Sequence, residues 1–277
     1  MKAAVRRQSL GLLAGALALT AASGGTACNR HPSAPTLTLV WQDEFDGPSG
    51  QSPDPSRWTF DVGTGWGNSQ LEYDTARPEN AALDGAGHLA ITARQENYSG
   101  QPYTSARLNT NGRFQQAGGR FEARMRMPSG RGLWPAFWLL GSNFSSVGWP
   151  ACGEIDVVEY RGQEPALVHG SVHGPGYSGG SALTQVIAVP GAPLDSAFHV
   201  YAVDWTAGKI VWSVDGNDYF TVTTADLPRG GTWVFDHPFF IILDLAVGGT
   251  FVGSPDSTTA FPQQLLVDYV RVYKEGS

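Results

Sequence analysis

The 277-residue sequence contains only two cysteines, few charged residues and no apolar stretch longer than 13 residues. Two cysteines are too few for a disulfide framework, and no group of Cys and His has the spacing of a zinc site. A run of 13 apolar residues is too short to span a bilayer as a helix. Charged residues make up 16%, the net charge is −7, and no basic run follows residue 7. We therefore expect no nucleic acid partner, because nucleic acid binding needs clustered positive charge.

Residues 1–27 have the pattern of an export signal. Lys2, Arg6 and Arg7 give a positive start, the apolar run follows at residues 10–22, and small residues at 25–27 offer a cleavage site. The sequence therefore predicts a protein that is secreted or associated with the cell envelope.

Cys28 follows this segment directly and resembles the lipid-accepting cysteine of bacterial lipoproteins. Gly25 stands where such a box usually has Leu, so a membrane lipid anchor at Cys28 and free secretion both stay open. Residues 28–38 contain two prolines and small polar residues, which predicts a short tether. Residues 39–277 show no repeat and no second linker, and we expect them to form one domain.

The pattern of that domain is all-β. Residues Arg120 to Met127 alternate polar and apolar side chains, as in a strand with one face in a core. Phe239 to Val247 is apolar on both parities, which indicates a buried central strand, and Asp215-Gly216 is a hairpin-turn signal. No stretch after residue 27 keeps apolar residues at helical spacing for three turns. Many short strands in a chain with 35 glycines predict a β-sandwich.

Three carboxylates lie within six residues in the segment Glu154–Glu159, which reads EIDVVE. The apolar residues between them favour a strand, in which Glu154 and Asp156 share one face. Strict alternation would place Glu159 on the opposite face. One extra residue, a β-bulge at Val157-Val158, would return Glu159 to the face of the other two acids. No basic residue interrupts the segment, which disfavours the alternative of an ordinary solvent-exposed strand face.

Two carboxylates on one face suit glycoside hydrolysis. A retaining enzyme uses one carboxylate as the nucleophile and a second as general acid and base, with the two groups about 5–5.5 Å apart. The nine tryptophans fit a sugar substrate, because indole rings stack on the apolar faces of sugar rings.

The EIDVVE segment resembles the signature of glycoside hydrolase family 16, in the bulged form typical of laminarinase-like endo-β-1,3-glucanases. Residues 132–138 (GLWPAFW) and 172–180 (VHGPGYSGG) also resemble segments of the laminarinase-like members. The resemblance runs from about Trp41 to Tyr273. It implies that residues 39–277 are a catalytic β-jelly roll, a concanavalin A-like sandwich of two curved antiparallel sheets. It also implies a retaining endo-glycosidase that hydrolyses internal β-1,3-glucosidic bonds of β-glucans such as laminarin.

Other activities of the same family stay open at this point. A β-1,3-1,4-glucanase, an agarase or a galactanase would use the same strand, because loops choose the sugar. A non-catalytic glucan-binding protein is a further alternative. Such relatives usually lose the glutamates, whereas this chain keeps both.

The resemblance also assigns roles to single residues. Glu154 would be the nucleophile, Glu159 the general acid and base, and Asp156 would position Glu154 and help to move the proton. Six further residues match segments that line the family's cleft and are the candidate substrate-binding residues: Trp134, Trp138, Arg107, His173, Asn68 and Trp205.

A structural calcium ion is implied by the resemblance alone. Its ligands would be Glu44, the carbonyl of Gly87 and Asp268, and it would join the two ends of the domain without a catalytic role. Surface carboxylates without a metal are the alternative. We expect no cofactor for catalysis, a β-glucan as the partner, and a monomer.

Overall fold

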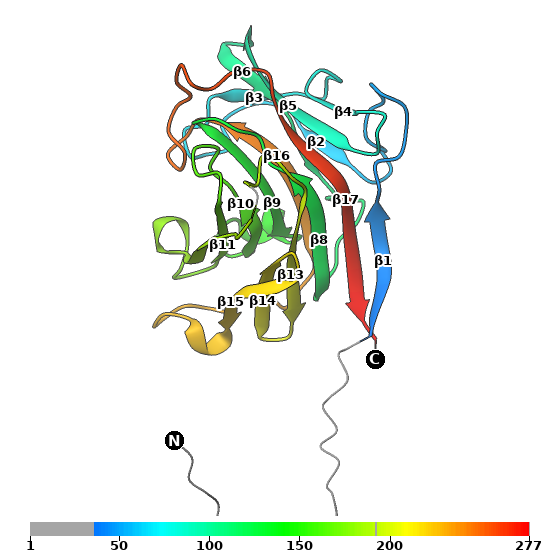
Figure 1. The fold of residues 1–277 in the computed structure, drawn as a ribbon. Helices are drawn as coiled ribbons and strands as arrows, with labels where there is room; N and C mark the ends of the chain where they lie inside the picture. Colours follow the sequence, from blue (N-terminus) through cyan, green and yellow to red (C-terminus); the bar gives the residue numbers. More distant parts are fainter. Residues whose placement is uncertain (1–35, 192, 277) are drawn as a thin grey trace, which may run out of the picture. The chain divides into compact units, whose positions relative to one another are not determined.

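The structure is a computed structural model that describes residues 36–191 and 193–276. The described residues belong to one compact unit, in which two β-sheets pack face to face (Figure 1). The all-β sandwich predicted from the sequence is confirmed. The predicted export signal, Cys28 and the start of the tether lie outside the described residues.

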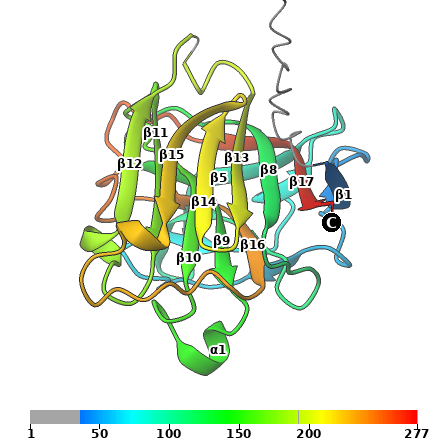
Figure 2. The same cartoon turned by 90° about the horizontal axis from the view of Figure 1, so that it is seen from below.

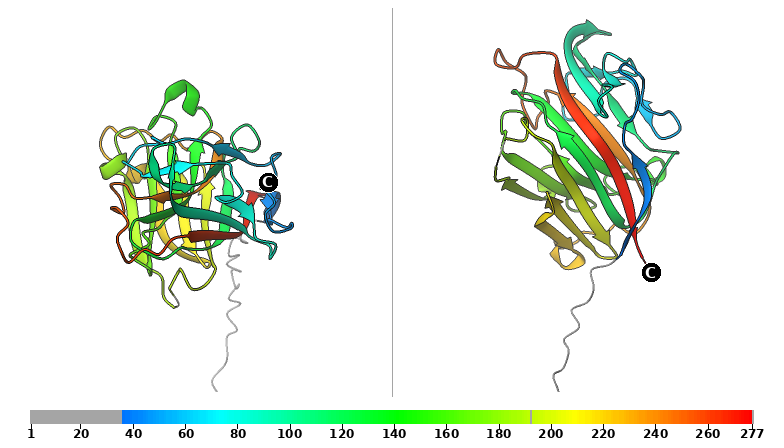
Figure 3. Two further views of the ribbon diagram at one scale, coloured as in Figure 1. Left: turned by 90° about the horizontal axis from the view of Figure 1, so that it is seen from above. Right: turned by 45° about the vertical axis from the view of Figure 1, so that its right-hand side comes forward.

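The larger sheet contains ten strands and both ends of the described chain. Its strands are β1 (Leu37–Asp43), β3 (Glu72–Asp74), β4 (Ala81–Leu83), β5 (Leu89–Tyr98), β6 (Gln101–Ser105), β8 (Gly119–Arg126), β13 (His199–Thr206), β14 (Lys209–Val214), β15 (Asn217–Thr223) and β17 (Gln263–Glu275). Their order is β15-β14-β13-β8-β17-β5-β6-β3, with β1 on β17 and β4 on β5. All pairs are antiparallel except β3–β6, which is parallel. The long strand β17 crosses this sheet beside β1 (Figures 1 and 3).

The smaller sheet contains seven strands and carries the three acids. Its strands are β2 (Thr59–Asp61), β7 (Arg107–Asn109), β9 (Leu133–Gly141), β10 (Glu154–Glu159), β11 (Leu167–His173), β12 (Leu183–Ala188) and β16 (Phe239–Val247). Their order is β12-β11-β10-β9-β16-β7-β2, and every pair is antiparallel.

Alternation along the strands builds the core between the two sheets. In β8, Phe121, Ala123 and Met125 are fully buried, while the arginines and the glutamate between them point to the other face. All nine residues of β16 are buried, because one face meets the core and the other lies beneath the site. Both strands were predicted from these patterns.

Helical structure is limited to short turns in the described part of the chain. These are α1 (Phe144–Val147) and two 3-10 turns, η1 (Gly179–Ser181) and η2 (Thr224–Asp226). Figure 2 shows α1 on a loop that projects away from the strands. Within residues 36–191 and 193–276, no helix has the length and apolar character needed to cross a membrane.

Candidate active site

Strand β10 carries the predicted β-bulge, which puts the three acids on one face. Asp156 is opposite Trp138 of β9 and Glu159 is opposite Ala136, so three steps of β10 match two steps of β9. Trp138 and Ala136 are two residues apart and share a face, and residues directly opposite in a sheet also share a face. Asp156 and Glu159 therefore lie together on the outer face of the smaller sheet. The bulge predicted at Val157-Val158 is confirmed.

Local sequence explains the shape of this strand. Val157 and Val158 are both buried in the core, so the extra residue is held by apolar packing. Gly153 precedes the strand with φ of +76°, a conformation that favours glycine. A Cβ atom on Gly153 would also lie 2.8 Å from the ring of Phe239. The chain therefore enters β10 along a path that a larger residue cannot follow.

Glu154 is held by two aromatic neighbours. The indole N–H of Trp149 donates to its Oε2 at 2.9 Å, and His173 is its direct partner on β11. The His173 Nε2 atom lies 3.6 Å from Glu154 Oε1 and 3.0 Å from Asp156 Oδ2. The second approach is off the hydrogen-bond direction, so Asp156 Oδ2 has no aligned donor within the described residues.

The tautomer of His173 follows from its other nitrogen. The backbone N–H of Gly179 donates to Nδ1 at 3.0 Å, so Nδ1 is an acceptor and the proton of the neutral ring is on Nε2. That nitrogen is the one near Glu154 and Asp156, and His173 favours the ionised form of Glu154. Contact between His173 and the bound sugar, which the resemblance implies, stays a prediction.

Burial raises the pKa of all three acids. It raises the pKa of Glu154 to about 8 and that of Asp156 to about 8, with the negative charge of Asp156 adding to the effect on Glu154. The pKa of Glu159 is raised well above its usual value by burial and by the charges of Asp156 and Glu154. Like charges at close range cannot all ionise together, so the group binds a proton at neutral pH.

Glu159 is well suited to be the group that carries this proton. The indole N–H of Trp134 donates to Glu159 Oε1 at 3.1 Å, and Trp134 packs on Phe251 with ring centroids 4.9 Å apart. Each indole donor lowers the pKa of the carboxylate that it contacts, Trp134 that of Glu159 and Trp149 that of Glu154. The charges of both Asp156 and Glu154 raise the pKa of Glu159, whereas Asp156 is the neighbouring charge that raises the pKa of Glu154, so Glu159 is the better candidate for the proton.

Arg107 and Trp138 lie on the same outer face. The Cζ atom of Arg107 is 4.7 Å from the ring centroid of Trp138, a cation–π distance, and its Nε donates to Asp61 Oδ2 at 3.0 Å. The indole N–H of Trp138 donates to Asp244 Oδ1 at 2.7 Å. The structure thus brings four of the six predicted substrate-binding residues around the acids: Trp134, Trp138, Arg107 and His173.

Asn68 lies in an exposed turn next to this face. Its φ of +53° is one that Asn tolerates, and its carbonyl accepts the N–H of Thr250 at 2.7 Å. A bridge between Gln70 and Gly248 ties the same turn to the end of β16. A sugar contact by the Asn68 side chain stays a prediction.

The prediction that Trp205 stacks on sugar is wrong. Trp205 is fully buried in the core, where it packs against Phe121 and Phe239 of opposite sheets. Its indole N–H donates to the carbonyl of Phe235 at 3.0 Å. The ring therefore fills space between the sheets and presents no surface to a substrate.

Several residues of the site escaped the sequence analysis. Trp149 is 45% exposed and contacts Glu154, and Trp66 is 37% exposed with Arg107 over its ring at 5.3 Å. Two features of the sequence could have identified them: Trp149 lies just before the acid motif, and Trp66 lies within the Gly-Trp-Gly-Asn turn. Four buried or half-buried acids also adjoin the site: Asp61, Glu72, Asp74 and Asp244.

The residues expected to bind calcium do not fit that ion. Glu44 gives both carboxylate oxygens to Arg271, at 2.8 Å each, and Asp268 pairs with Arg124. Calcium needs six to eight oxygen ligands, whereas these carboxylates neutralise arginines. We therefore assign no role to a metal at Glu44, Gly87 and Asp268.

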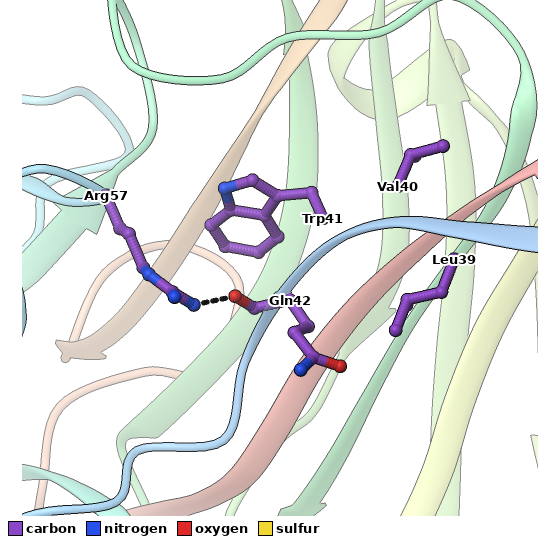
Figure 4. A pocket seen from close by; sticks show the side chains of 5 residues that line it. All are labelled: Leu39, Val40, Trp41, Gln42 and Arg57. Carbon is purple, nitrogen blue, oxygen red and sulfur yellow. Dashed lines mark hydrogen bonds between the residues drawn. The ribbon is translucent and has the colours of Figure 1, made fainter.

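A surface hollow of about 370 Å³ lies beside β1 on the larger sheet (Figure 4). It is lined by Leu39, Val40, Trp41, Gln42 and Arg57, and Arg57 donates to the carbonyl of Gln42. No carboxylate lines it, so the chemistry lies with the acids of β10.

A β-sandwich with paired carboxylates on one face of a bulged strand, where burial and mutual repulsion keep a proton on the group, defines a glycoside hydrolase. The sequence profile of the glycosyl hydrolases family 16 matches residues 67–271, and the chain belongs to that family.

Named relatives agree with this assignment. The chain is 48% identical to a β-glucanase of Rhodothermus marinus over 257 residues, covering 89% of this chain and 88% of the relative. It is 34% identical to glucan endo-1,3-beta-glucosidase A1 of Niallia circulans, with 88% of this chain and 39% of that protein covered. The catalytic domain of an endo-1,3-beta-glucanase (laminarinase) from Thermotoga petrophila superposes with a TM-score of 0.83, 42% identity, and 88% of this chain and 100% of that one covered.

Proposed function

We propose that this protein is a retaining endo-β-1,3-glucanase that hydrolyses internal bonds of laminarin-type β-glucans. The observation that carries the proposal is the β-bulge, which places Glu159 on the same face as Glu154 and Asp156. The family, and the names of the relatives found, support the reaction and the β-1,3-glucan substrate.

The geometry supports a double displacement. Glu154 attacks the anomeric carbon while Glu159 gives its proton to the leaving oxygen, so one C–O bond forms as the other breaks. The product of this step is a sugar ester on Glu154. Water then attacks the anomeric carbon, gives its proton to Glu159, and releases Glu154 as a carboxylate.

The two neighbours of Glu154 assist the reaction. Asp156 lies beside it and His173 Nε2 lies within 3.6 Å, so both act on the nucleophile's orientation and charge. Esterification of Glu154 removes one negative charge from the group. The pKa of Glu159 then falls, which suits its second role as a base.

A product assay on a panel of polysaccharides tests the proposal. We expect short oligosaccharides from laminarin, smaller release from lichenan, and none from agarose or galactan. Proton NMR early in the reaction should show new reducing ends in the β configuration, as retention requires. Binding to laminarin without release of reducing ends would mean a glucan-binding protein, and release from agarose alone would move the substrate to a galactan.

We further propose that residues 1–27 direct export and that residues 39–277 form the catalytic domain of a monomer. The support for export is the pattern of residues 1–27, and Cys28 directly after it is the candidate for lipid attachment. Cell fractionation of wild type and Cys28→Ala tests both points. A lipid anchor predicts wild type in the membrane fraction and the variant in the medium, and free secretion predicts both in the medium. Retention of both in the cytoplasm would contradict export.

A further inference from the structure

Asp244 lies in the middle of β16, on the outer face that carries the three acids. In the sheet register it is opposite Ala136 on one side and Arg107 on the other, and Ala136 is opposite Glu159. One row across the sheet therefore contains the general acid, a small alanine, the Asp244 carboxylate and the Arg107 guanidinium. Asp244 is 7% exposed, and the double displacement gives it no role.

The contacts of Asp244 lead to Trp138. Its Oδ1 accepts the indole N–H at 2.7 Å, while Arg107 lies over the same ring with Cζ 4.7 Å from the centroid. Arg107 is in turn held by Asp61 through a 3.0 Å hydrogen bond to Nε. Trp138 is thus fixed at its edge by one charged group and on its face by another.

The same arrangement occurs at Trp66, on the other side of Arg107. The Trp66 indole N–H donates to Asp74 Oδ2 at 2.8 Å, and the Arg107 Cζ atom is 5.3 Å from the Trp66 ring. Both indoles flank one guanidinium, and each donates to a buried carboxylate. Charged contacts therefore set the orientation of these two rings, in addition to apolar packing.

The charge of Asp244 depends on its surroundings. Burial raises the pKa of Asp244 to about 6, against the opposing effects of Arg107 and of the hydrogen bond from Trp138. Asp244 interacts electrostatically with ionisable groups on several neighbouring strands. These are Arg107 of β7, Asp61 of β2, Glu72 and Asp74 of β3, and Asp156 of β10. All but Arg107 are acids, so ionisation of Asp244 is opposed by neighbours as well as by burial.

We propose that Asp244 is a positioning residue that holds Trp138 and Arg107 in their sugar-binding orientation while its carboxylate is ionised, so that acid weakens substrate binding. The inference rests on the proposed function, because it takes a β-glucan as the ligand. It adds a group that acts on substrate binding and does not touch the reacting bond.

The direction of the change in KM follows from the two protonation states of Asp244. Above about pH 6 the carboxylate is charged, the bond from Trp138 is charge-assisted, and Arg107 has an anion beside it. Below that pH the carboxyl is neutral, the hydrogen bond is weaker, and Arg107 loses one of its two nearby counter-charges. KM should therefore rise as pH falls through about 6, with the change located in binding rather than in turnover.

Steady-state kinetics on laminarin at about pH 5 and about pH 7.5 test this for wild type and Asp244→Asn. For wild type we expect KM to be about fivefold higher at the lower pH, the difference between a charge-assisted and a neutral hydrogen bond. The Asn side chain keeps the acceptor oxygen but has no charge. The KM of Asp244→Asn should therefore be high and nearly equal at both pH values. We expect kcat of the variant to stay within about twofold of wild type at each pH.

Asp204→Asn provides the matched control. Asp204 pairs with Arg120 on the larger sheet, so this variant removes the same charge away from the site. It should keep the wild-type change in KM. If Asp244→Asn also keeps that change, or if it lowers kcat while KM stays unchanged, the positioning role is wrong.

A binding measurement separates this inference from the proposed function. Titration of a laminari-oligosaccharide into Glu154→Gln, with and without Asp244→Asn, gives the dissociation constant without turnover. We expect acid to weaken binding only when Asp244 is present, and equal pH dependence in the two proteins would overturn the inference. Asp244→Ala, which also lacks the acceptor, should bind weakly at every pH. Wild-type protein that does not cleave laminarin contradicts the proposed function, whereas the binding series judges Asp244 alone.

Discussion

Trp149 donates its indole N–H to Glu154 Oε2 at 2.9 Å, which ties an exposed loop residue to the proposed nucleophile. This bond lowers the pKa of Glu154 against the larger opposing effects of burial and of Asp156. Trp149→Phe keeps an aromatic ring near His173 but removes the donor. We expect the acid limb of the kcat/KM profile to move to higher pH, so that kcat/KM on that limb falls about tenfold if the pKa rises by about one.

A pH series of kcat/KM for wild type and Trp149→Phe measures this effect. Trp233→Phe is the control, because Trp233 packs against Phe235 rather than a carboxylate. An unchanged acid limb in Trp149→Phe would show that the Trp149 bond does not tune the nucleophile.

The roles of the two glutamates can be separated by the leaving group. Glu154→Gln and Glu159→Gln should each lower turnover of laminarin by at least about a thousandfold while the melting temperature changes little. An aryl β-glucoside with an acidic phenol needs no protonation to leave, so Glu159→Gln should keep rapid release of the phenol in the first turnover. Glu154→Gln should not, because it lacks the nucleophile. Equal recovery in both variants would contradict the assignment.

Glu72 should make the folded state less stable as pH rises. Burial raises the pKa of Glu72 to about 7 from its usual 4.5, although its carboxylate accepts the N–H of Val247. A raised carboxyl pKa contributes stability below pH 4.5 that is lost as pH increases to about 7. This loss is about 3 kcal/mol, because a pKa difference of one between the folded and unfolded states corresponds to about 1.4 kcal/mol.

Urea unfolding at about pH 5 and about pH 7.5 checks this prediction. Glu72→Gln keeps an acceptor for Val247 and has no proton to lose, so its free energy of unfolding should change less between the two values. Glu79 is exposed, so the stability of the control variant Glu79→Gln should change with pH as that of wild type does. A variant as pH-sensitive as wild type would show that Glu72 does not carry the effect.

Calcium removal should leave stability unchanged. Glu44 and Asp268 are paired with Arg271 and Arg124, so neither carboxylate is available as a ligand. We expect excess EDTA to shift the melting temperature by less than about 1 °C, and Glu44→Gln to cost no more than about 1 kcal/mol, the usual limit for an exposed ion pair. A rise of several degrees on adding calcium would restore the metal site that the family resemblance implies.

Alternation and the acid motif predicted much of this fold and site. Strand β8 and the central strand β16 are where the sequence placed them, and the bulge followed from the need to bring Glu159 to the face of Glu154. These features depend on neighbouring residues in the chain. A local pattern is therefore enough to predict them.

The side of the sheet that a tryptophan faces was harder to predict. Trp205 is two residues from Val203 and four from Tyr201, so the three share one face of the strand. Because Tyr201 and Val203 are fully buried, this face belongs to the core. The contacts of Arg107 had no local signal, because Asp61 is 46 residues away in sequence and Asp244 is on another strand. Parity tells which residues share a face, but only the packing of two sheets decides which face is covered.

The Asp244 carboxylate of β16 also makes sugar binding a proton-linked event. If a neutral oligosaccharide binds best when Asp244 is ionised, its binding near or below about pH 6 removes a proton from this group. The protein then releases protons to the buffer when it binds an uncharged ligand. Calorimetric binding enthalpies will consequently depend on the ionisation heat of the buffer, although the substrate itself carries no ionisable group.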